Sequence, residues 1–226
     1  FTHAEEARKH IEAGAKRVLI SAPAKGHDAT IVLGVNEKTL KKEHVIISAG
    51  SCTTNCVAPV IKILNDTLGI KSAFFITTHA YTSTQRLIDG VDKKDLRRGR
   101  AAAIDIVPGT SGASQSVIEA IPELQGKLGG YALRVPVVNG SITSVIAQVT
   151  NQASVEEINA LFKKKSKEMA GVLDYTEDPI VSADIIHNPN SSIFDSTLTG
   201  VNGEQVSVAL MAMAIHELGH EAISQT

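Results

Sequence analysis

The chain has 226 residues, of which 43% are hydrophobic and 20% are charged, and its net charge is −2. These values are typical of a globular protein that buries a sizeable core in one or two domains. No basic tract dominates, so we expect no nucleic-acid partner. No apolar segment approaches the roughly 18 residues that a membrane-spanning helix needs, so we expect no membrane partner. Two cysteines in a chain of this length indicate a reducing compartment, and we expect a cytoplasmic protein.

The first part of the chain has the pattern of an α/β sheet. It carries no signal-peptide pattern, and Phe1 is not an initiator residue, so we expect a fragment or a product of processing. Residues 2–5 resemble a capping box and predict a helix to about Ala13. Strands are expected over 17–21, 31–35 and 45–48, and their separation by helix or loop indicates the edge of a parallel sheet. The sequence has no G-x-G-x-x-G turn that could hold a pyrophosphate.

Residues 51–56, with the sequence SCTTNC, stand between a strand-like run and a helix. The apolar positions that follow, up to Leu68, recur at helical spacing and stop at Gly69. Cys52 is therefore expected next to a helix N-terminus, where unpaired N–H groups and the helix dipole favour a negative charge. This position favours the nucleophilic thiolate. The alternative for Cys52 is a small buried apolar residue, and burial is the role expected of Cys56 on the same helix.

The remaining sequence predicts an α+β domain. We expect a long strand over 72–81, a polar and basic loop over 83–100, a strand over 102–107 and a helix that follows the turn at 109–113. Asn139-Gly140 predicts a type I′ hairpin that joins strands over 131–138 and 141–149. Ser154 is expected to cap a helix that runs to about Met169. Short strands at 180–183, 192–194 and 206–210 and a C-terminal helix over 210–226 complete the expected elements.

A catalytic thiol needs a base, and His79, near the end of the long expected strand, is the candidate. A histidine in a strand more often has a structural role, but groups that can bind phosphate surround it and Cys52 in the sequence. Arg134 lies within an apolar strand, where an unpaired charge is costly, so we expect it to face a polar cleft. The residues that offer hydroxyl, backbone N–H or guanidinium groups are Ser51, Thr53, Thr82, Arg98, Ser111, Gly112 and Arg134.

These residues and the segments around them resemble the phosphorylating glyceraldehyde-3-phosphate dehydrogenase family. SCTTNC at 51–56 and TTHAYT at 77–82 are the most specific of the matching segments. The resemblance extends over residues 1 to about 206. The other matching segments are ISAPAKG at 20–26, DLRRGRAAA at 95–103, IPELQGKL at 121–128, ALRVPV at 132–137 and DYT at 174–176.

The resemblance implies two unequal domains. Residues 1–51 would be the remnant of a doubly wound α/β dinucleotide-binding domain. Residues 52–226 would be an α+β catalytic domain, a mostly antiparallel sheet with helices on one face and a tail that diverges from about residue 206. The implied cofactor is NAD, with NADP left open, and Ser21 and Ala22 match positions on its nicotinamide side. The implied assembly is a homotetramer, with 83–100 as the loop at a subunit interface.

The resemblance also implies a step of glycolysis, the oxidation and phosphorylation of glyceraldehyde 3-phosphate to 1,3-bisphosphoglycerate. Cys52 would form a thioester with His79 as base, and inorganic phosphate would cleave it. A four-carbon sugar phosphate stays open as substrate. The substrate phosphate would be bound by Thr82, Arg98 and Arg134, and the attacking phosphate by Ser51, Thr53, Ser111, Gly112 and Arg134.

The sequence departs from the family pattern at several places. Ala49-Gly50 stands where Asn-Ala is usual, Ser111 where Thr is usual, and Gln115 where Lys is common. The tail lacks the expected Trp-containing segment and its asparagine, which would orient the nicotinamide. Because most of the nucleotide-binding half is missing, we expect this chain to bind NAD weakly or not at all.

Two alternatives remain. His216, Glu217 and His220 form an H-E-x-x-H pattern, in which two histidines on one helix face can share a zinc ion and the glutamate can act as a base. This pattern would indicate a zinc-binding module or a zinc hydrolase. The other alternative is a non-enzymatic fragment that lacks cofactor binding and assembles with another chain that supplies the dinucleotide domain.

Overall fold

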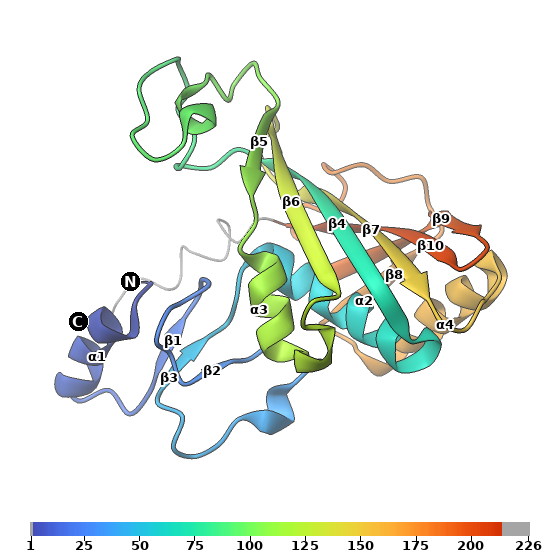
Figure 1. Cartoon of the computed structure of the whole chain (residues 1–226), viewed down its shortest axis with the longest axis horizontal. Helices are drawn as coiled ribbons and strands as arrows, with labels where there is room; N and C mark the ends of the chain where they lie inside the picture. Colours follow the sequence, from blue (N-terminus) through green and yellow to red (C-terminus); the bar gives the residue numbers. More distant parts are fainter. Residues whose placement is uncertain (1, 214–226) are drawn as a thin grey trace.

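The computed structural model describes residues 2–213. A small three-stranded sheet at the N-terminal end lies beside a larger seven-stranded sheet that carries most of the core (Figure 1). His216, Glu217 and His220, and most of the helix expected over 210–226, lie outside the described residues. The start of that expected helix is wrong, because residues 210–212 continue a strand.

The N-terminal sheet is parallel, as the sequence predicts. It contains β1 (Val18–Ile20), β2 (Ala29–Thr30) and β3 (Ile46–Ser48) in the order β1-β3-β2, after helix α1 (Ala4–Glu12). The predicted capping box is wrong, since His3 is the N-cap and no side chain caps the helix.

The strand expected over 31–35 is also wrong. Asn36 accepts a hydrogen bond from the backbone N–H of Val32 and donates one to the carbonyl of Thr30, both at 2.8 Å. These two bonds hold the chain in a turn, which precedes the short 3-10 helix η1 (Glu37–Thr39).

The large sheet is mixed, with more antiparallel than parallel pairs. Its order is β5-β6-β4-β7-β10-β9-β8, in which only β4–β6 and β8–β9 are parallel. The strands are β4 (Ile70–Ala80), β5 (Val107–Thr110), β6 (Leu128–Val135), β7 (Ser141–Val149), β8 (Leu173–Thr176), β9 (Ser192–Asn202) and β10 (Gln205–Ala212).

The hairpin predicted at Asn139-Gly140 does not form. Gly140 has the positive φ of 82° that suits a turn, but β4 lies between β6 and β7 and pairs with both. The turn therefore crosses the end of β4, where the Ala80 N–H donates to the Gly140 carbonyl at 3.1 Å. A local turn signal does not reveal that a third strand occupies the space between the two expected partners.

Other strand boundaries also differ from the prediction. Residues 102–105 form a turn, and β5 begins at Val107. β5 includes Pro108, which has no N–H to donate; an edge strand tolerates this residue because one of its sides has no neighbouring strand to bond. The strand expected at 180–183 is wrong, since residues 180 and 181 lie in a loop and residues 182–187 form turns. The short strand expected at 192–194 extends to Asn202 and forms a hairpin with β10 through Gly203.

Three helices cover one face of the large sheet: α2 (Cys52–Leu68), α3 (Ala113–Ala120) and α4 (Val155–Glu168). Side chains alternate along each strand, so Phe75, Val145 and Leu210 are buried beneath these helices. Ser154 caps α4 in a capping box with Glu157, as predicted. The loop 81–106 carries the 3-10 helix η2 (Leu96–Gly99) and extends beyond β5, while η3 (Pro122–Leu124) follows α3 (Figure 1).

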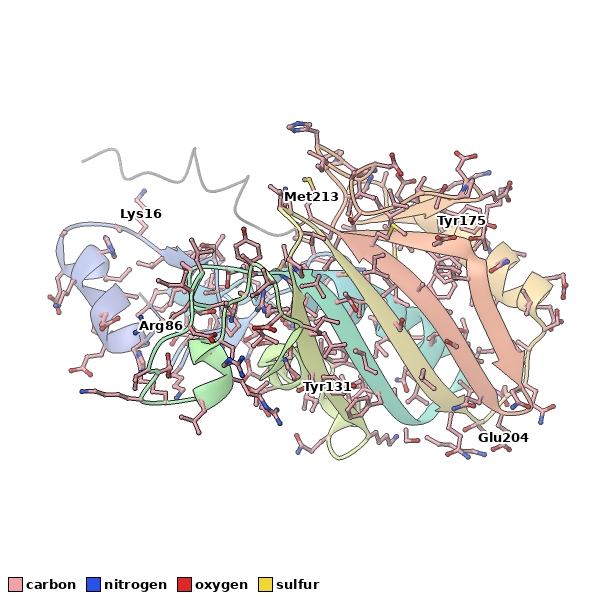
Figure 2. All side chains as sticks on the ribbon, turned by 90° about the horizontal axis from the view of Figure 1, so that it is seen from above. Lys16, Arg86, Tyr131, Tyr175, Glu204 and Met213 are labelled. Carbon is pink, nitrogen blue, oxygen red and sulfur yellow. The ribbon has the colours of Figure 1, made fainter. Side chains whose placement is uncertain are left out.

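The opposite face of the large sheet lacks a covering layer among residues 2–213. Phe74 and Ile146 are opposite each other on β4 and β7, and both are exposed. The Tyr131 ring on β6 lies 5.8 Å from that of Phe74. Figure 2 shows Tyr131 and Glu204 along one side of the sheet. None of the described helices is both long enough and apolar enough to cross a membrane.

Candidate functional site

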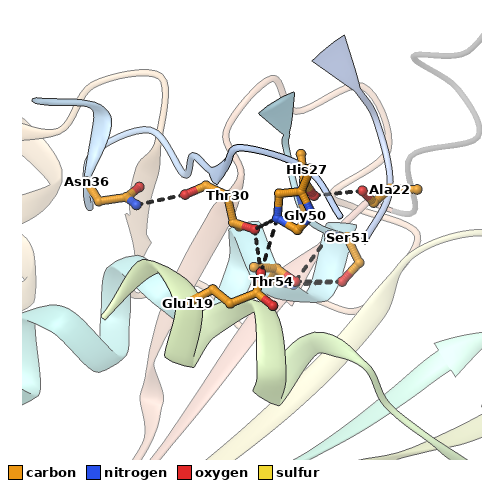
Figure 3. A network of polar contacts seen from close by, with 9 residues as sticks. Ala22, His27, Thr30, Asn36, Gly50, Ser51, Thr54 and Glu119 are labelled. Carbon is orange, nitrogen blue, oxygen red and sulfur yellow. Dashed lines mark hydrogen bonds and ion pairs between the residues drawn. The ribbon is translucent and has the colours of Figure 1, made fainter. Parts of the chain in front are cut away.

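The start of α2 places Cys52 as the first residue of the helix. Ser51 is the N-cap, and its Oγ accepts a hydrogen bond from the Thr54 N–H at 3.1 Å. Thr54 Oγ1 accepts in turn from the Ser51 N–H at 3.1 Å, which completes a capping box (Figure 3). The prediction that Cys52 lies at a helix N-terminus is confirmed.

Gly50 precedes this helix start in a left-handed conformation. Its φ of 69° lies in the left-handed region that glycine adopts without strain. A Cβ at this position would lie 2.8 Å from Thr54 Cγ2, closer than carbon atoms normally approach. The departure from the family pattern at Ala49-Gly50 therefore has a local structural role in the turn that precedes Cys52.

The thiol faces a histidine on the neighbouring sheet. Cys52 Sγ lies 3.3 Å from His79 Nε2, within hydrogen-bond reach for sulfur. His79 is buried near the end of β4. Its strand partners are Arg134 on β6 and Ser141 on β7. The strand pairing therefore delivers a guanidinium to the side of the imidazole that faces away from the thiol.

Arg134 contacts the second imidazole nitrogen. Its Nη1 lies 2.7 Å from His79 Nδ1 and 3.1 Å from the Ala80 carbonyl oxygen. Burial lowers the pKa of Arg134, the cation at Arg98 lowers it further, and a negative charge on Cys52 would act in the opposite direction. An arginine keeps its charge at neutral pH even so, and the pocket beside Cys52 is therefore positively charged.

These groups line a cavity of about 190 Å³. Gly112 is the N-cap of α3, and Ser111 Oγ accepts from the Ala113 N–H at 3.2 Å. Ser111, Gly112 and Ala113 line the cavity, so the N-terminus of α3 borders it. The lining residues are Pro23, Ser51, Cys52, Thr53, Thr77, His79, Thr110, Ser111, Gly112, Ala113, Ala132 and Arg134.

Thr77 is a lining residue that the sequence reasoning did not single out. It is buried, and its Oγ1 has no hydrogen-bond partner within the described part of the chain. The available signal is strand periodicity, because Thr77 lies two residues before His79 and shares its face of β4. A buried hydroxyl without a protein partner fits a cavity that binds a polar group.

Four predicted site residues do not line this cavity. Thr82 bonds within its own loop: its backbone N–H donates to Gln85 Oε1 at 2.9 Å, and its Oγ1 lies 3.1 Å from Thr84 Oγ1. Arg98 lies in η2, 3.8 Å from Asp95. Ser21 and Ala22 follow β1, where the Ala22 carbonyl accepts from Ser48 Oγ at 2.8 Å.

Cys56 is buried in the core, as predicted. Its Sγ lies 3.7 Å from Ser192 Oγ, and burial raises the pKa of its thiol to about 12. The two cysteines of one helix therefore differ in environment, since only Cys52 borders the cavity.

Within residues 2–213, no group of three or more His, Cys, Asp or Glu side chains could hold a metal ion. The H-E-x-x-H pattern at His216, Glu217 and His220 is not part of that search, because it lies outside the described residues.

The mixed α+β domain holds a thiol–imidazole pair beside an arginine and a helix N-terminus, an arrangement of the kind that proteins with a nucleophilic cysteine use. The comparisons with known proteins define the class further. Residues 51–212 match the model of the family "Glyceraldehyde 3-phosphate dehydrogenase, C-terminal domain".

Curated relatives agree with this match. The chain is 51% identical over 209 residues to glyceraldehyde-3-phosphate dehydrogenase of Mycobacterium bovis (strain BCG / Pasteur 1173P2), an alignment that covers 92% of this chain and 61% of the relative. It is 49% identical over 222 residues to glyceraldehyde-3-phosphate dehydrogenase 2 of Streptomyces avermitilis, covering 97% and 66%. The chain belongs to the glyceraldehyde-3-phosphate dehydrogenase family and spans about 61% of the length of the first of these relatives.

Proposed function

We propose that this chain carries the acylating half of a phosphorylating glyceraldehyde-3-phosphate dehydrogenase, an oxidoreductase of glycolysis. The observation that carries the proposal is the 3.3 Å contact between Cys52 Sγ and His79 Nε2 at a helix N-terminus. Family membership supports a phosphorylated aldehyde, glyceraldehyde 3-phosphate, as the proposed substrate.

In the proposed reaction, Cys52 Sγ attacks the aldehyde carbon. A C–S bond forms, and the carbonyl oxygen takes the electron pair and a proton from His79 Nε2, which gives a hemithioacetal. His79 then takes back the hydroxyl proton as the carbon is oxidised to a thioester. When bound, NAD would supply the hydride acceptor for this oxidation. An oxygen of inorganic phosphate finally attacks the thioester carbon, and the C–S bond breaks to return the thiolate.

The phosphate groups require cationic and N–H donors. For the attacking phosphate we propose the cavity beside Cys52, with Ser51, Thr53, Ser111, Gly112 and Arg134 as donors, supported by their shared cavity and the N-terminus of α3. For the phosphate of the substrate we propose Thr82, Arg98 and Arg134. Two observations support this second phosphate site. The TTHAYT and DLRRGRAAA segments match the family, and, besides burial, the positive charge of Arg98 lowers the pKa of Arg134.

The described residues offer only part of a site for NAD. Pro23 lines the cavity, so Ser21 and Ala22, at the carboxyl end of β1, fit the nicotinamide end of the cofactor. Among residues 2–213, no helix follows β1 directly to present its N-terminus to a pyrophosphate. We propose residues 1–51 as the C-terminal part of a dinucleotide-binding domain and 52–226 as the catalytic domain. The use of NADP stays open.

Calorimetric titration with NAD tests this part of the proposal. We expect weak heat signals or none from this chain. Nanomolar to low-micromolar binding would show that residues 1–51 suffice for the cofactor and would contradict the partial-site interpretation.

We also propose a homo-oligomer, a tetramer by family resemblance, in the reducing environment of the cytoplasm. The exposed face of the large sheet around Phe74, Tyr131 and Ile146 supports an interface with a second copy, because contiguous apolar surface of this kind marks interaction sites. Two unpaired cysteines support a reducing compartment.

Alkylation with iodoacetamide tests the activated thiol. We expect Cys52 to react faster than free cysteine at neutral pH, and Cys56 to stay unmodified in the folded chain. Peptide mass spectrometry assigns the modified residue, with Cys52→Ser and Cys56→Ser as matched variants. A Cys52 that reacted no faster than free cysteine would contradict the proposal.

A further inference from the structure

The chain contains two Val-Asn-Gly triplets, at residues 138–140 and 201–203. Asparagine is a chemically labile residue, because the backbone nitrogen that follows it can attack its side-chain amide and close a succinimide ring. Glycine in the next position favours this attack, since it has no Cβ to obstruct the approach. The two triplets are identical in sequence, so only their environments in the folded chain can make them react differently.

In the first triplet the reacting groups are already in contact. The Gly140 N–H donates to Asn139 Oδ1 at 2.7 Å. Rotation about the last side-chain bond then brings Cγ, the atom bonded to Oδ1, toward the Gly140 nitrogen. This N–H takes no part in the pairing of β4 with β7, which begins at Ser141. No bond of the sheet therefore has to break before the nitrogen attacks.

This turn is open to water on one side and packed on the other. Val138 is 96% exposed and Asn139 is half-buried, so solvent base and water reach the side-chain amide. Gly140 is buried, and a Cβ at this position would lie 3.4 Å from the Ser182 carbonyl oxygen. Its φ of 82° holds the turn in a left-handed conformation. The packing keeps the nitrogen in place while the amide stays accessible.

The second triplet has a different geometry. Asn202 ends β9 and pairs with Gln205 across the hairpin to β10. Among the hydrogen bonds of residues 2–213, none joins the Gly203 N–H to the Asn202 side chain. The strand pairing holds the backbone extended, and no contact places the amide at the next nitrogen. Asn202 is therefore a sequence-matched internal reference for Asn139.

The first triplet also adjoins the end of β4 beside the thiol site. The Gly140 carbonyl accepts from the Ala80 N–H at 3.1 Å, and the Ala80 carbonyl oxygen lies 2.7 Å from His79 Nδ1. Ser141, the next residue, is the β7 partner of His79. An added main-chain atom at residue 139 would disturb both the contact with Ala80 and the register that positions His79.

We propose that Asn139 is a site of spontaneous deamidation and that its isoaspartyl product impairs the thiol site by lengthening the main chain next to the end of β4. The Gly140 nitrogen loses its proton to solvent base and bonds to Asn139 Cγ, the Cγ–Nδ2 bond breaks, and Nδ2 leaves as ammonia. Water then opens the succinimide at either carbonyl. One opening gives aspartate, and the other gives isoaspartate, in which the main chain runs through Cγ. The modification itself is independent of the proposed function, whereas its effect on Cys52 rests on it.

Peptide mapping by mass spectrometry tests the modification on the folded chain after incubation at mildly alkaline pH. An isoaspartyl methyltransferase with labelled S-adenosylmethionine detects the isoaspartate. We expect Asn139 to convert faster than Asn202 in the folded chain, and the two to convert at similar rates in urea, where the shared sequence alone decides. Conversion of folded Asn139 no faster than that of Asn202 would overturn the proposal.

Acylation of Cys52 by acetyl phosphate tests the consequence. Chains with isoaspartate at 139 should form the thioester about tenfold more slowly, because small displacements of catalytic groups are costly. Asn139→Gln, whose longer side chain closes no succinimide, should keep its rate through the same incubation, while Asn202→Gln should slow like the unmodified chain. Equal slowing of Asn139→Gln would overturn the proposed effect on the site.

Repair gives a readout that needs no variant. Prolonged treatment with the methyltransferase converts isoaspartate to aspartate and should restore the acylation rate, which general unfolding would not allow. An acylation rate that is unaffected by isoaspartate at 139, or that does not recover on repair, would contradict the effect on Cys52. If the fresh chain forms no thioester at all, the proposed function fails, and the peptide map still decides whether Asn139 is the modified residue.

Discussion

Cys52, His79 and Arg134 come from three different elements and meet because of strand register. His79 is central in a sheet in which β4 pairs with β6 on one side and β7 on the other. A shift of one residue in the β4–β6 register would turn Arg134 to the opposite face and remove it from the imidazole. The chemistry of the thiol therefore depends on long-range pairing as much as on the residues in its own helix.

The role of His79 gives the first prediction. His79→Asn keeps a polar side chain of similar reach but cannot transfer a proton, so acyl transfer to Cys52 should slow by about 10²-fold or more. Stopped-flow or quenched-flow kinetics with an acyl phosphate measures the rate, and His10→Asn, at an exposed position of α1, serves as a matched control. A rate within a factor of two of the unmodified chain would contradict the role of His79 as acid and base.

At this scale the sequence predicted the partners but not their contacts. The order Ser51, Cys52, Thr53 and the position of His79 near a strand end sufficed to expect a thiol–imidazole pair. The direct contact of Arg134 with Nδ1 follows from the β4–β6 pairing, which no local pattern contains. Thr77 was accessible through strand periodicity and was missed because its type carries no obvious chemistry.

Among the elements, α2 positions Cys52 through the contacts of its first turn. The capping box between Ser51 and Thr54 and the left-handed Gly50 fix the direction in which Cys52 Sγ points. Thr54 lies on the buried side of the helix and does not line the cavity, so its role is to support the site.

Thr54→Val tests this support. Valine has nearly the same shape but cannot accept the Ser51 N–H, so we expect a loss of about 1 kcal/mol in the free energy of unfolding and slower alkylation of Cys52. Thr67→Val removes a hydroxyl bonded to the Ile63 carbonyl at the other end of the same helix. The account would be wrong if both variants affected Cys52 equally.

The tie between β2 and β3 depends on pH. Asp28 Oδ2 accepts from the N–H groups of Ile46 and Val45 at 2.9 and 2.7 Å, and these bonds lower the pKa of Asp28 from its ordinary value. Because the pKa of Asp28 is lowered in the folded state, its carboxylate stabilises the fold when the pH is above the pKa of an unfolded-state aspartate. This stabilisation is lost as the pH falls through the folded-state pKa.

Asp28→Asn should therefore lower Tm at neutral pH, and the difference from the unmodified chain should shrink toward zero in acid. Thermal unfolding followed by circular dichroism across the acid range measures it. The control is Asp66→Asn, which removes an exposed ion pair with Lys62 and should change Tm little at any pH. A Tm difference for Asp28→Asn that did not vary with pH would contradict the assignment.

Element boundaries show where local patterns fail. The capping boxes at Ser51 and Ser154, the helix end at Gly69 and the start of α3 at Gly112 follow local rules and are found in the structure. The turn at Asn139-Gly140 also forms, yet its strands are separated by β4. The difference is physical, since a cap depends on neighbours within one turn whereas a strand pairing depends on residues far along the chain.

In the whole molecule, polar contacts connect the N-terminal sheet to helix α3, which packs on the large sheet. Thr30 Oγ1 donates to Glu119 on α3, and His27 Nε2 lies 2.7 Å from Thr30 Oγ1 and 3.5 Å from Glu119 Oε2 (Figure 3). The helix that ends near Glu119 begins at the Gly112 cap beside Cys52. The N-terminal segment and the cavity beside Cys52 are thus linked through one short helix.

The exposed sheet face gives a prediction about assembly. Ile146→Glu places a charge in the middle of the face formed with Phe74 and Tyr131, so we expect the oligomer to dissociate. Light scattering after size-exclusion chromatography measures the mass. Val181→Glu, at an exposed position in a loop, is the matched control. An unchanged oligomer in Ile146→Glu would locate the interface elsewhere.

The most direct test of the central claim is acyl transfer without any cofactor. The chain is incubated with acetyl phosphate, in which case the Cys52 thiolate attacks the acyl carbon, the C–O bond breaks and phosphate leaves. We predict one thioester per chain, detected by intact mass, located at Cys52 by peptide mapping and reversed by added phosphate. Cys56→Ser should acylate like the unmodified chain, whereas Cys52→Ser should not. Absence of the thioester, or its appearance on Cys56, would contradict the assignment of Cys52 as the nucleophile.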